Sequence, residues 1–155
     1  MATNELDLTD SKILTILQKD ANVSIKEIAY QTHKSIATVH ERIRRLKEQG
    51  YILRTVAILN RKKINKSLIA FSQVILSGHS DKILSDFTNE VVKFPEVMEC
   101  FQMTGRSDFL LRIVTNDMEE YSQFYNHKLT KLPNVNTVQS AFVMSENKSD
   151  TAYPI

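Results

Sequence analysis

The chain of 155 residues has one cysteine, three glycines, three prolines and no tryptophan. A lone cysteine, Cys100, cannot form an internal disulfide, which predicts a protein of the reducing cytoplasm. Three glycines exclude a glycine-rich phosphate-binding loop. No apolar run approaches the roughly 18 residues of a membrane-spanning helix, and the acidic, polar residues 1–10 do not have the pattern of a secretory signal. We therefore expect no membrane partner.

Groups that could support catalysis are also scarce. Cys100 lies in a run with an apolar pattern, which favours a buried small hydrophobic residue over a nucleophile. No metal-ligand spacing joins the four histidines, so solvated or locally bonded side chains are the default interpretation for His33, His40, His79 and His127. We predict that the protein is not an enzyme and has no metal and no cofactor.

Charge is unevenly distributed along the chain. Residues 1–66 contain 13 Lys and Arg against 7 Asp and Glu, whereas residues 67–155 contain 7 against 11. The overall charge of +2 thus combines a basic N-terminal part with an acidic C-terminal part. A basic module next to an acidic one indicates that only the first meets a polyanion.

The most informative stretch is Ser24 to Gly50. Ser24 and Glu27 have the spacing of a capping box at the start of a short helix. Ser35 is a candidate N-cap for a second, longer and basic helix, and Gly50 is suited to the left-handed conformation that ends it. A short helix, a tight turn and a long basic helix together predict a DNA-binding helix-turn-helix more strongly than a solvated amphipathic helix.

The outward face of the second helix is small and hydroxylic at its N-terminal end and cationic in its C-terminal half. Such a helix can approach base edges with its first residues and reach phosphates with its cations. For base reading we predict Ser35, Ala37, Thr38 and Glu41, and for phosphate contacts His40, Arg44, Arg45 and Lys47. Arg42 flanks the apolar stripe, so it is expected to brace the fold through an internal carboxylate instead.

The flanking segments complete this module. Leu6 to Lys19 is predicted as a first helix, capped by Asp7 or Thr9. Tyr51 to Leu59 is rich in β-branched and aliphatic residues and is predicted as a strand forming a small wing. We therefore assign residues 1–59 to a winged helix-turn-helix domain and 60–66 to a basic linker, which is either a solvated hinge or a further phosphate contact.

The pattern changes at Ser67 to strands separated by helices. Strands are predicted at 68–76, 97–104, 109–115 and 135–144, with helices at 81–94 and 117–132. This order, βαββαβ, is that of a ferredoxin-like fold over residues 67–155, and the whole chain is of the α+β class. Residues from Glu146 onward have no periodicity and are expected to fray or to pack on a partner chain.

Two features of this second module indicate binding. The first strand is apolar on both of its faces, and one of these faces carries Ile69, Phe71 and Ile75. Because helices cover only one face of such a sheet, we predict that the other, open face pairs with another subunit. The turn Thr104 to Asp108 gathers a hydroxyl, a glycine, a cation and a carboxylate, the groups that an amino-acid ligand needs. An ordinary polar hairpin turn with glycine at positive φ is the alternative.

The frame that carries a family resemblance spans both modules. Its N-terminal part comprises Leu6-Asp7, Asp10, Ile13-Leu14, Leu17, Asp20, Ile28-Ala29, Ser35, Thr38-Val39, Arg42-Ile43, Leu46, Gly50 and Ile52. Its C-terminal part comprises Pro95-Glu96-Val97, Thr104 to Asp108, Leu110-Leu111, Leu132-Pro133 and Val135. With this frame the chain resembles the Lrp/AsnC (feast/famine) transcriptional regulators along nearly its whole length.

The resemblance implies a winged helix-turn-helix joined to a ligand-responsive ferredoxin-like domain, the RAM domain. It implies homodimers, which in this family often assemble further into octamers, and a free amino acid as effector. By position, the effector site would comprise Thr104, Gly105, Arg106, Asp108 and Ser140. The chain departs from the family at Val138, where threonine is common, and at Asn65, where glycine is usual and where asparagine can adopt the same conformation.

The sequence therefore predicts a regulator that binds specific sites on double-stranded DNA and responds to a small effector, with an amino acid as the expected one. The alternative is an oligomeric architectural protein that coats DNA with little sequence preference.

Overall fold

The structure is a computed structural model, and it describes residues 6–155. The chain forms two compact units, one made of Met1–Ile58 with Asn147–Ile155 and the other of Leu59–Glu146. Residues 1–5 lie outside the described residues. The predictions about a secretory signal and about the start of the first domain depend partly on them. Within 6–155, no helix is both long enough and apolar enough to cross a membrane.

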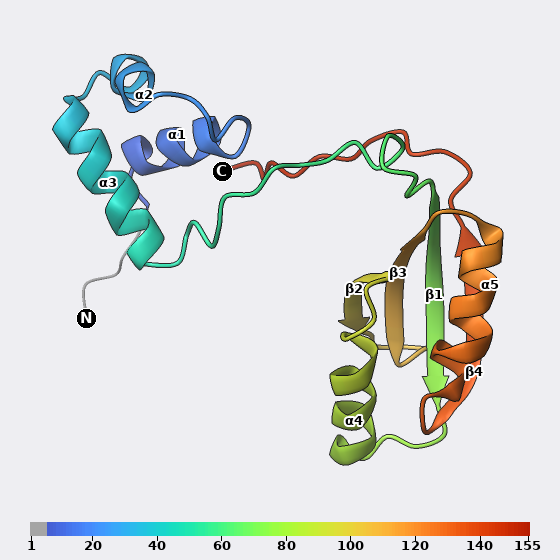
Figure 1. The fold of residues 1–155 in the computed structure, drawn as a ribbon. Coiled ribbons are helices and arrows are strands. Elements are labelled where there is room, and N and C mark those ends of the chain that lie inside the picture. The colour runs from blue at the N-terminus through green and yellow to red at the C-terminus, as the bar shows by residue number, and fades with distance from the viewer. Residues whose placement is uncertain (1–5) are drawn as a thin grey trace. The chain divides into compact units, whose positions relative to one another are not determined.

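Three helices make up the first unit: α1 (Leu8–Leu17), α2 (Ile25–Thr32) and α3 (Ile36–Glu48) (Figure 1). Each begins at a side chain that accepts a backbone N–H, as the sequence predicts. The Asp7 carboxylate accepts from Asp10 N at 2.8 Å, and the Ser24 and Ser35 hydroxyls accept from the third residue of their helices at 3.1 Å each. These caps fix where the helices start.

The ends of α2 and α3 are set by residues in the left-handed conformation. His33 has φ 53° and Gly50 has φ 79°. The Lys34 N–H then donates to Ala29 O at 3.0 Å, and the Tyr51 N–H donates to Leu46 O at 2.9 Å. This hydrogen-bond pattern is a common way to satisfy the last carbonyls of a helix, and it turns the chain sharply between α2 and α3.

The core of the helical unit consists of Ile13, Ile28, Ala29, Val39 and Leu46, all buried. They come from all three helices, so the unit holds together by packing their apolar stripes.

The predicted wing strand at residues 51–59 is wrong. The segment has no strand assignment, and most of its apolar side chains, Leu53, Val56, Ile58 and Leu59 among them, are exposed. Strand-forming residue types are not sufficient for a strand, because its backbone N–H and C=O groups must pair with a neighbouring strand. Within the described chain no strand pairs with this segment.

The second unit is built on a four-stranded antiparallel sheet of order β2-β3-β1-β4 (Figure 1). The strands are β1 (Leu68–Leu76), β2 (Val97–Gln102), β3 (Phe109–Thr115) and β4 (Val135–Phe142). The helices are α4 (Asp81–Val91) and α5 (Met118–His127), and α5 continues into a short 3-10 helix, η1 (Leu129–Lys131). The βαββαβ order predicted from the sequence is confirmed.

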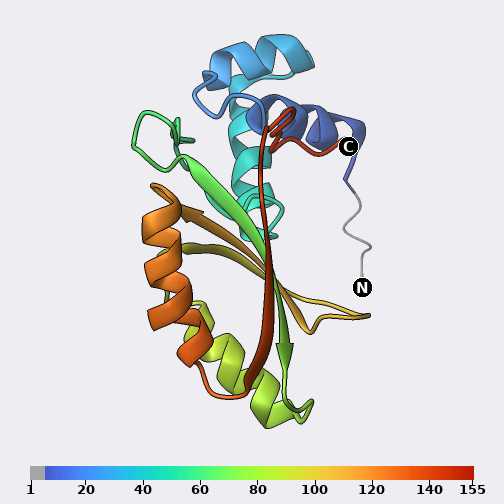
Figure 2. The same ribbon diagram turned by 90° about the vertical axis from the view of Figure 1, so that its right-hand side faces the viewer.

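Both helices lie on one face of this sheet, as Figure 2 shows. Between them and the sheet lies a core that includes Val74, Phe87, Leu111, Phe124 and Leu129, each at most 2% exposed. The opposite face carries no helix of the unit. Alternation along β1 places Phe71 on that open face, and its side chain is 36% exposed.

The linker is a compact turn with a definite structure. Asn65 has φ 60°, so asparagine does adopt the left-handed conformation there, as predicted. Arg61 donates to Ser67 O at 2.8 Å and pairs with Glu146 at 3.3 Å, and Lys66 pairs with Glu120 at 3.2 Å. Two of the linker cations are thereby engaged within the second unit.

Residues Asn147–Ile155 group with the helical unit by their contacts. The side-chain amide of Gln18, at the end of α1, donates to Tyr153 O at 2.6 Å and accepts from Tyr153 N at 2.8 Å. One side chain thus satisfies both backbone groups of a residue 135 positions away. The expectation of a frayed tail fails because of this long-range pairing, which local sequence cannot indicate.

Candidate nucleic-acid interface and effector hairpin

The outward face of α3 is open to solvent. All eight residues predicted to contact DNA lie on α3 or at its N-cap, and all are exposed: Ser35, Ala37, Thr38, His40, Glu41, Arg44, Arg45 and Lys47. The inner face packs through Val39 and Leu46, whereas Ile36, in the first turn, is exposed. Within the helical unit, the described residues therefore leave this face free for a partner.

The two hydroxyl groups at the start of α3 bond to each other. The Ser35 and Thr38 oxygens are 2.8 Å apart, and Ser35 also accepts the Thr38 N–H. Both side chains are short and exposed, and each hydroxyl keeps hydrogen-bonding capacity. The first turn of α3 thus presents hydroxyl groups without bulk.

A buried carboxylate ties α3 to α1. Asp10 is 2% exposed, and its two oxygens accept from Arg42 at 2.8 Å and from Arg45 at 2.6 Å. Arg42 also pairs with Asp7 at 2.6 Å. The predicted bracing role of Arg42 through an internal carboxylate is confirmed. Arg45, predicted to contact phosphate, also braces the fold, and its side chain is 45% exposed.

This arrangement changes the titration of Asp7. The Asp10 backbone N–H and the Arg42 guanidinium lower the pKa of the Asp7 carboxyl below its ordinary value of 3.8. Because the pKa is lower in the folded chain, the Asp7 carboxylate stabilises the fold fully above about pH 4, and that contribution is lost as the pH falls through the lowered pKa. The α1 cap therefore weakens in acid.

A second ion-pair group lies on the exposed side of α3. The Arg44 guanidinium donates to both Glu41 oxygens, at 2.6 and 3.0 Å, and to Glu48 Oε1 at 2.7 Å. The hydrogen bonds from Arg44 lower the pKa of Glu41, and Glu41, with Glu48, raises the pKa of Arg44. All three side chains are more than half exposed, so solvent screens their attraction.

Lys47 differs from the three arginines of α3. Within residues 6–155 it makes no ion pair and no side-chain hydrogen bond, and it is exposed. It lies in the last turn, where a cation is favoured by the helix dipole. Lys47 is therefore the α3 cation that can meet an anion without giving up a partner.

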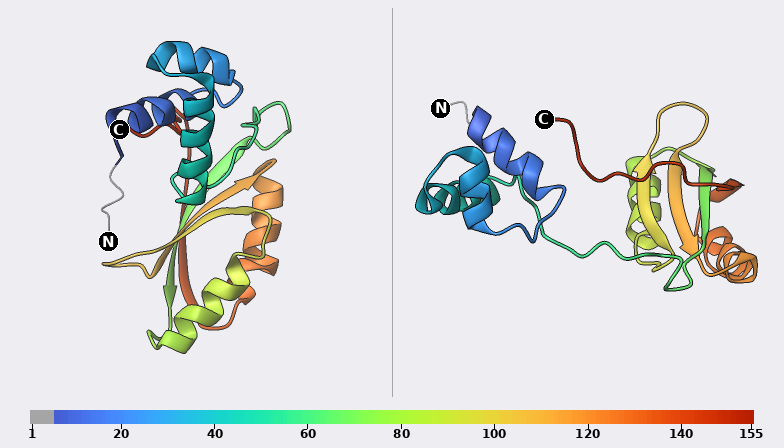
Figure 3. Two further views of the ribbon diagram at one scale, coloured as in Figure 1. Left: turned by 90° about the vertical axis from the view of Figure 1, so that its left-hand side faces the viewer. Right: turned by 90° about the horizontal axis from the view of Figure 1, so that it is seen from above.

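The predicted effector turn lies at the tip of the β2–β3 hairpin, which projects beyond the sheet (Figure 3). Thr104, Gly105 and Arg106 are exposed, and Gly105 has φ 112°, a conformation that favours glycine. Asp108 is 16% exposed, and its carboxylate accepts from Leu76 N at 2.7 Å and contacts His79 Nε2 at 3.0 Å. Asp108 thus links the hairpin to the end of β1.

Ser140 lies apart from that hairpin. It is paired with Ser72 across β4 and β1, and β1 and β3 separate its strand from β2. Its hydroxyl is 2.8 Å from Ser72 Oγ and accepts from the Tyr121 hydroxyl of α5 at 2.5 Å. Sequence reasoning did not identify this hydroxyl triad or the contact of His79 with Asp108, because both join residues distant along the chain.

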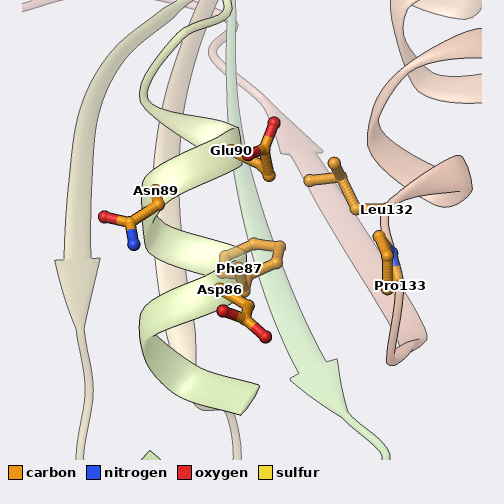
Figure 4. A pocket seen from close by; sticks show the side chains of 6 residues that line it. All are labelled: Asp86, Phe87, Asn89, Glu90, Leu132 and Pro133. Atoms are coloured by element: carbon orange, nitrogen blue, oxygen red, sulfur yellow. The ribbon is translucent and has the colours of Figure 1, made fainter. Parts of the chain in front are cut away.

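A separate hollow lies between α4 and the turn that precedes β4 (Figure 4). Two carboxylates, an amide and three apolar residues line it: Asp86, Phe87, Asn89, Glu90, Leu132 and Pro133. None of the predicted effector residues contributes to this hollow. Among the residues that the structure describes, no group of three or more His, Cys, Asp or Glu side chains could hold a metal ion.

Family models match both units of the chain. Residues 6–52 match a winged helix-turn-helix DNA-binding model, and residues 69–153 match the Lrp/AsnC ligand binding domain. The two matches together cover most of the chain, in the order expected from the resemblance.

Characterised relatives and solved structures agree with these matches. The Bkd operon transcriptional regulator of Pseudomonas aeruginosa is 34% identical over 97% of this chain and 99% of its own. The leucine-responsive regulatory protein of Escherichia coli is 34% identical over 93% of this chain and 88% of its own. A transcriptional regulator from Neisseria meningitidis, solved as its complex with L-Met, superposes with a TM-score of 0.92 at 33% identity, covering 97% of each chain.

Proposed function

The chain belongs to the Lrp/AsnC family of transcriptional regulators, and we propose that it contacts DNA through the exposed face of α3. The protein is a DNA-binding regulator with an effector-binding domain, and its relatives are regulators and not enzymes. Such a regulator works where the DNA is, and we assign it to the cytoplasm. The relatives favour this function over an architectural coating protein.

The observation that carries the proposal is the free outward face of α3. Ser35, Ala37 and Thr38 offer small groups at the end that approaches base edges, and Glu41 can accept from a base amino group. Arg44, Arg45 and Lys47 follow on the same helix and can reach phosphates. We retain His40 as a phosphate contact because it is exposed on this face.

Lys47 gives the cleanest test of this assignment. Lys47→Ala is expected to reduce the slope of log affinity against log salt by about 1, because one phosphate contact is lost. The measurement is a salt titration of binding to a duplex selected from random-sequence DNA. Arg45→Ala is less suitable, because it also removes a partner of Asp10.

The control for this titration is Lys82→Ala, which removes an exposed lysine of α4 in the second unit. It should leave the slope unchanged. If Lys47→Ala and Lys82→Ala have the same slope as the unaltered protein, Lys47 does not contact phosphate.

We propose that the tip of the β2–β3 hairpin binds an amino acid. The exposed Arg106 can pair with the ligand carboxylate, Thr104 and the backbone at Gly105 can add hydrogen bonds, and Asp108 can accept from its ammonium. The relative solved with L-Met supports an effector of this class. The assignment of Ser140 rests on the family resemblance alone, since its hydroxyl bonds to Tyr121.

Calorimetric titration with each of the twenty amino acids tests the effector proposal. We expect at least one to bind, and Arg106→Ala to weaken that binding by about tenfold or more, because a hydrogen bond to a charged group contributes about 1.5–3 kcal/mol. Lys131→Ala, at an exposed lysine of η1, is the control. Unaltered binding by Arg106→Ala removes the hairpin from the site.

We further propose that the open face of the sheet pairs with a second copy of the chain. Phe71 and Phe101 are 36% and 47% exposed there, and Leu110 lies beside Gln73 and Phe101 in the strand register. Arg112 and Glu99 pair at 3.0 Å on the same face. An apolar patch of this kind with a charged pair is typical of a subunit interface.

A further inference from the structure

Every arginine of α3 is held by a carboxylate, but the pairs are of two kinds. Arg42 and Arg45 bond to the buried Asp10, which orients the helix. Arg44 bonds only to Glu41 and Glu48, and these three side chains are 56%, 62% and 58% exposed. An exposed pair of this kind contributes little to stability, because solvent screens the attraction. The pairs of Arg44 can therefore be broken and remade when an anion arrives.

The two carboxylates that share Arg44 occupy different places on the helix. Glu41 lies one turn after the small residues at the N-terminal end, where a base edge can be reached. Glu48 is the last residue of α3, and its side chain has no other hydrogen bond or ion pair within residues 6–155. A carboxylate in the last turn is disfavoured by the helix dipole, so the favourable contact of Glu48 within residues 6–155 is its pair with Arg44.

From this geometry we infer that Glu48 competes with DNA phosphate for Arg44 and so limits the sequence-independent part of the affinity for DNA. The inference rests on the proposed function, in which α3 meets DNA. Glu48 Oε1 is held by Arg44 Nη1 at 2.7 Å, within the distance at which a phosphate oxygen would bind the same nitrogen. A phosphate must displace Glu48 from that nitrogen, and Glu48 also repels the phosphate.

The consequence is a division of roles between two residues with the same charge. Glu41 reads sequence and Glu48 restrains binding to any sequence. Loss of the Glu48 charge frees only Arg44 Nη1, which can then bind phosphate on every duplex while Glu41 still holds Nε and Nη2. Loss of the Glu41 charge frees Nε and Nη2 instead, but also removes the acceptor for a base at the preferred site.

The test measures the affinity of Glu48→Gln for a duplex selected from random-sequence DNA and for a shuffled duplex of equal length and composition. We expect Glu48→Gln to bind both about threefold more tightly, from the range of energies of exposed ion pairs. The salt slope is expected to steepen by up to about 1. Glu41→Gln should gain on the shuffled duplex and lose its preference for the selected one.

Two controls separate this competition from a general effect of net charge. Glu27→Gln removes an exposed carboxylate of α2 that bonds to Gln31 and should leave both affinities unchanged. In an Arg44→Ala background, Glu48→Gln should lose its gain, because the competition needs Arg44. A gain equal to that of Glu27→Gln, or one that persists without Arg44, overturns the inference.

Arg44→Ala alone separates failure of the inference from failure of the proposed function. It is expected to weaken binding to both duplexes. If Arg44→Ala weakens binding but Glu48→Gln changes nothing, the competition is wrong and the DNA-binding face stands. If Arg44→Ala leaves both affinities unchanged, Arg44 does not contact DNA, and the inference fails together with that part of the proposed function.

Discussion

Asp10→Ala is expected to lower the free energy of unfolding of the helical unit by about 2–3 kcal/mol, because it leaves two guanidinium groups without their shared buried partner. Loss of one partner from a fully buried pair costs about 3–5 kcal/mol. The smaller figure applies here because the side chains of Arg42 and Arg45 are 22% and 45% exposed, so water can replace part of the lost contact.

Amide hydrogen exchange in α1 and α3 measures this effect in the unit concerned. The amides that exchange by unfolding of that unit should exchange about 30- to 150-fold faster in Asp10→Ala. Asp10→Asn, which keeps the size and one oxygen acceptor, should have an intermediate effect. Asp86→Ala, at an exposed position of α4, is the matched control. Exchange in Asp10→Ala as slow as in the control means that the carboxylate does not hold α3 to α1.

Phe71→Asp is expected to weaken self-association by more than about a hundredfold, since an unpaired charge buried at an interface costs about 3 kcal/mol or more. The fold of the single chain should persist after this substitution. The new carboxylate would be partly exposed there, and it would lie beside Arg112 in the strand register. Sedimentation of the unaltered protein should give dimers or larger assemblies at micromolar concentration, and that of Phe71→Asp monomers.

Val92→Asp provides the control for this experiment. Val92 is an exposed apolar residue at the end of α4, on the helix side of the sheet, and its replacement should leave the assembly unchanged. A monomer for the unaltered protein, or equal assembly of Phe71→Asp, contradicts the proposed interface.

The sequence was informative wherever structure depends on near neighbours. Alternation and β-branched residues predicted β1 with its observed ends, 68–76, and the serine caps predicted the starts of α2 and α3. A cap joins a side chain to a backbone group three residues away, so local spacing contains the necessary information. For the same reason the left-handed residues Gly50, Asn65 and Gly105 were predictable.

Pairing between distant residues set the limit of prediction. The segment 51–59 has the composition of a strand but pairs with none in the described chain, and composition does not indicate a missing partner. Arg45 appeared to be a free cation, whereas its partner Asp10 lies 35 residues earlier. Its position on the helix was predicted, but its electrostatic surroundings were not.

The effector residues show the same limit. The sequence grouped Thr104 to Asp108 because they are consecutive, and their hairpin is confirmed. It could not indicate that the Asp108 carboxylate bonds to the end of β1, or that Ser140 faces Tyr121 on the helix side of the sheet. The face on which a strand residue lies depends on register with its neighbours, which is settled only when the sheet forms.

We propose that copies of α3, joined by the second unit, enter the major groove of DNA at specific sites. Guanine-N7 methylation protection on a selected duplex tests this most directly, because that atom lies in the major groove. We expect two protected patches per dimer, separated by about 10 base pairs or a multiple of that distance. Continuous protection without such spacing, or no major-groove protection at all, would contradict the account.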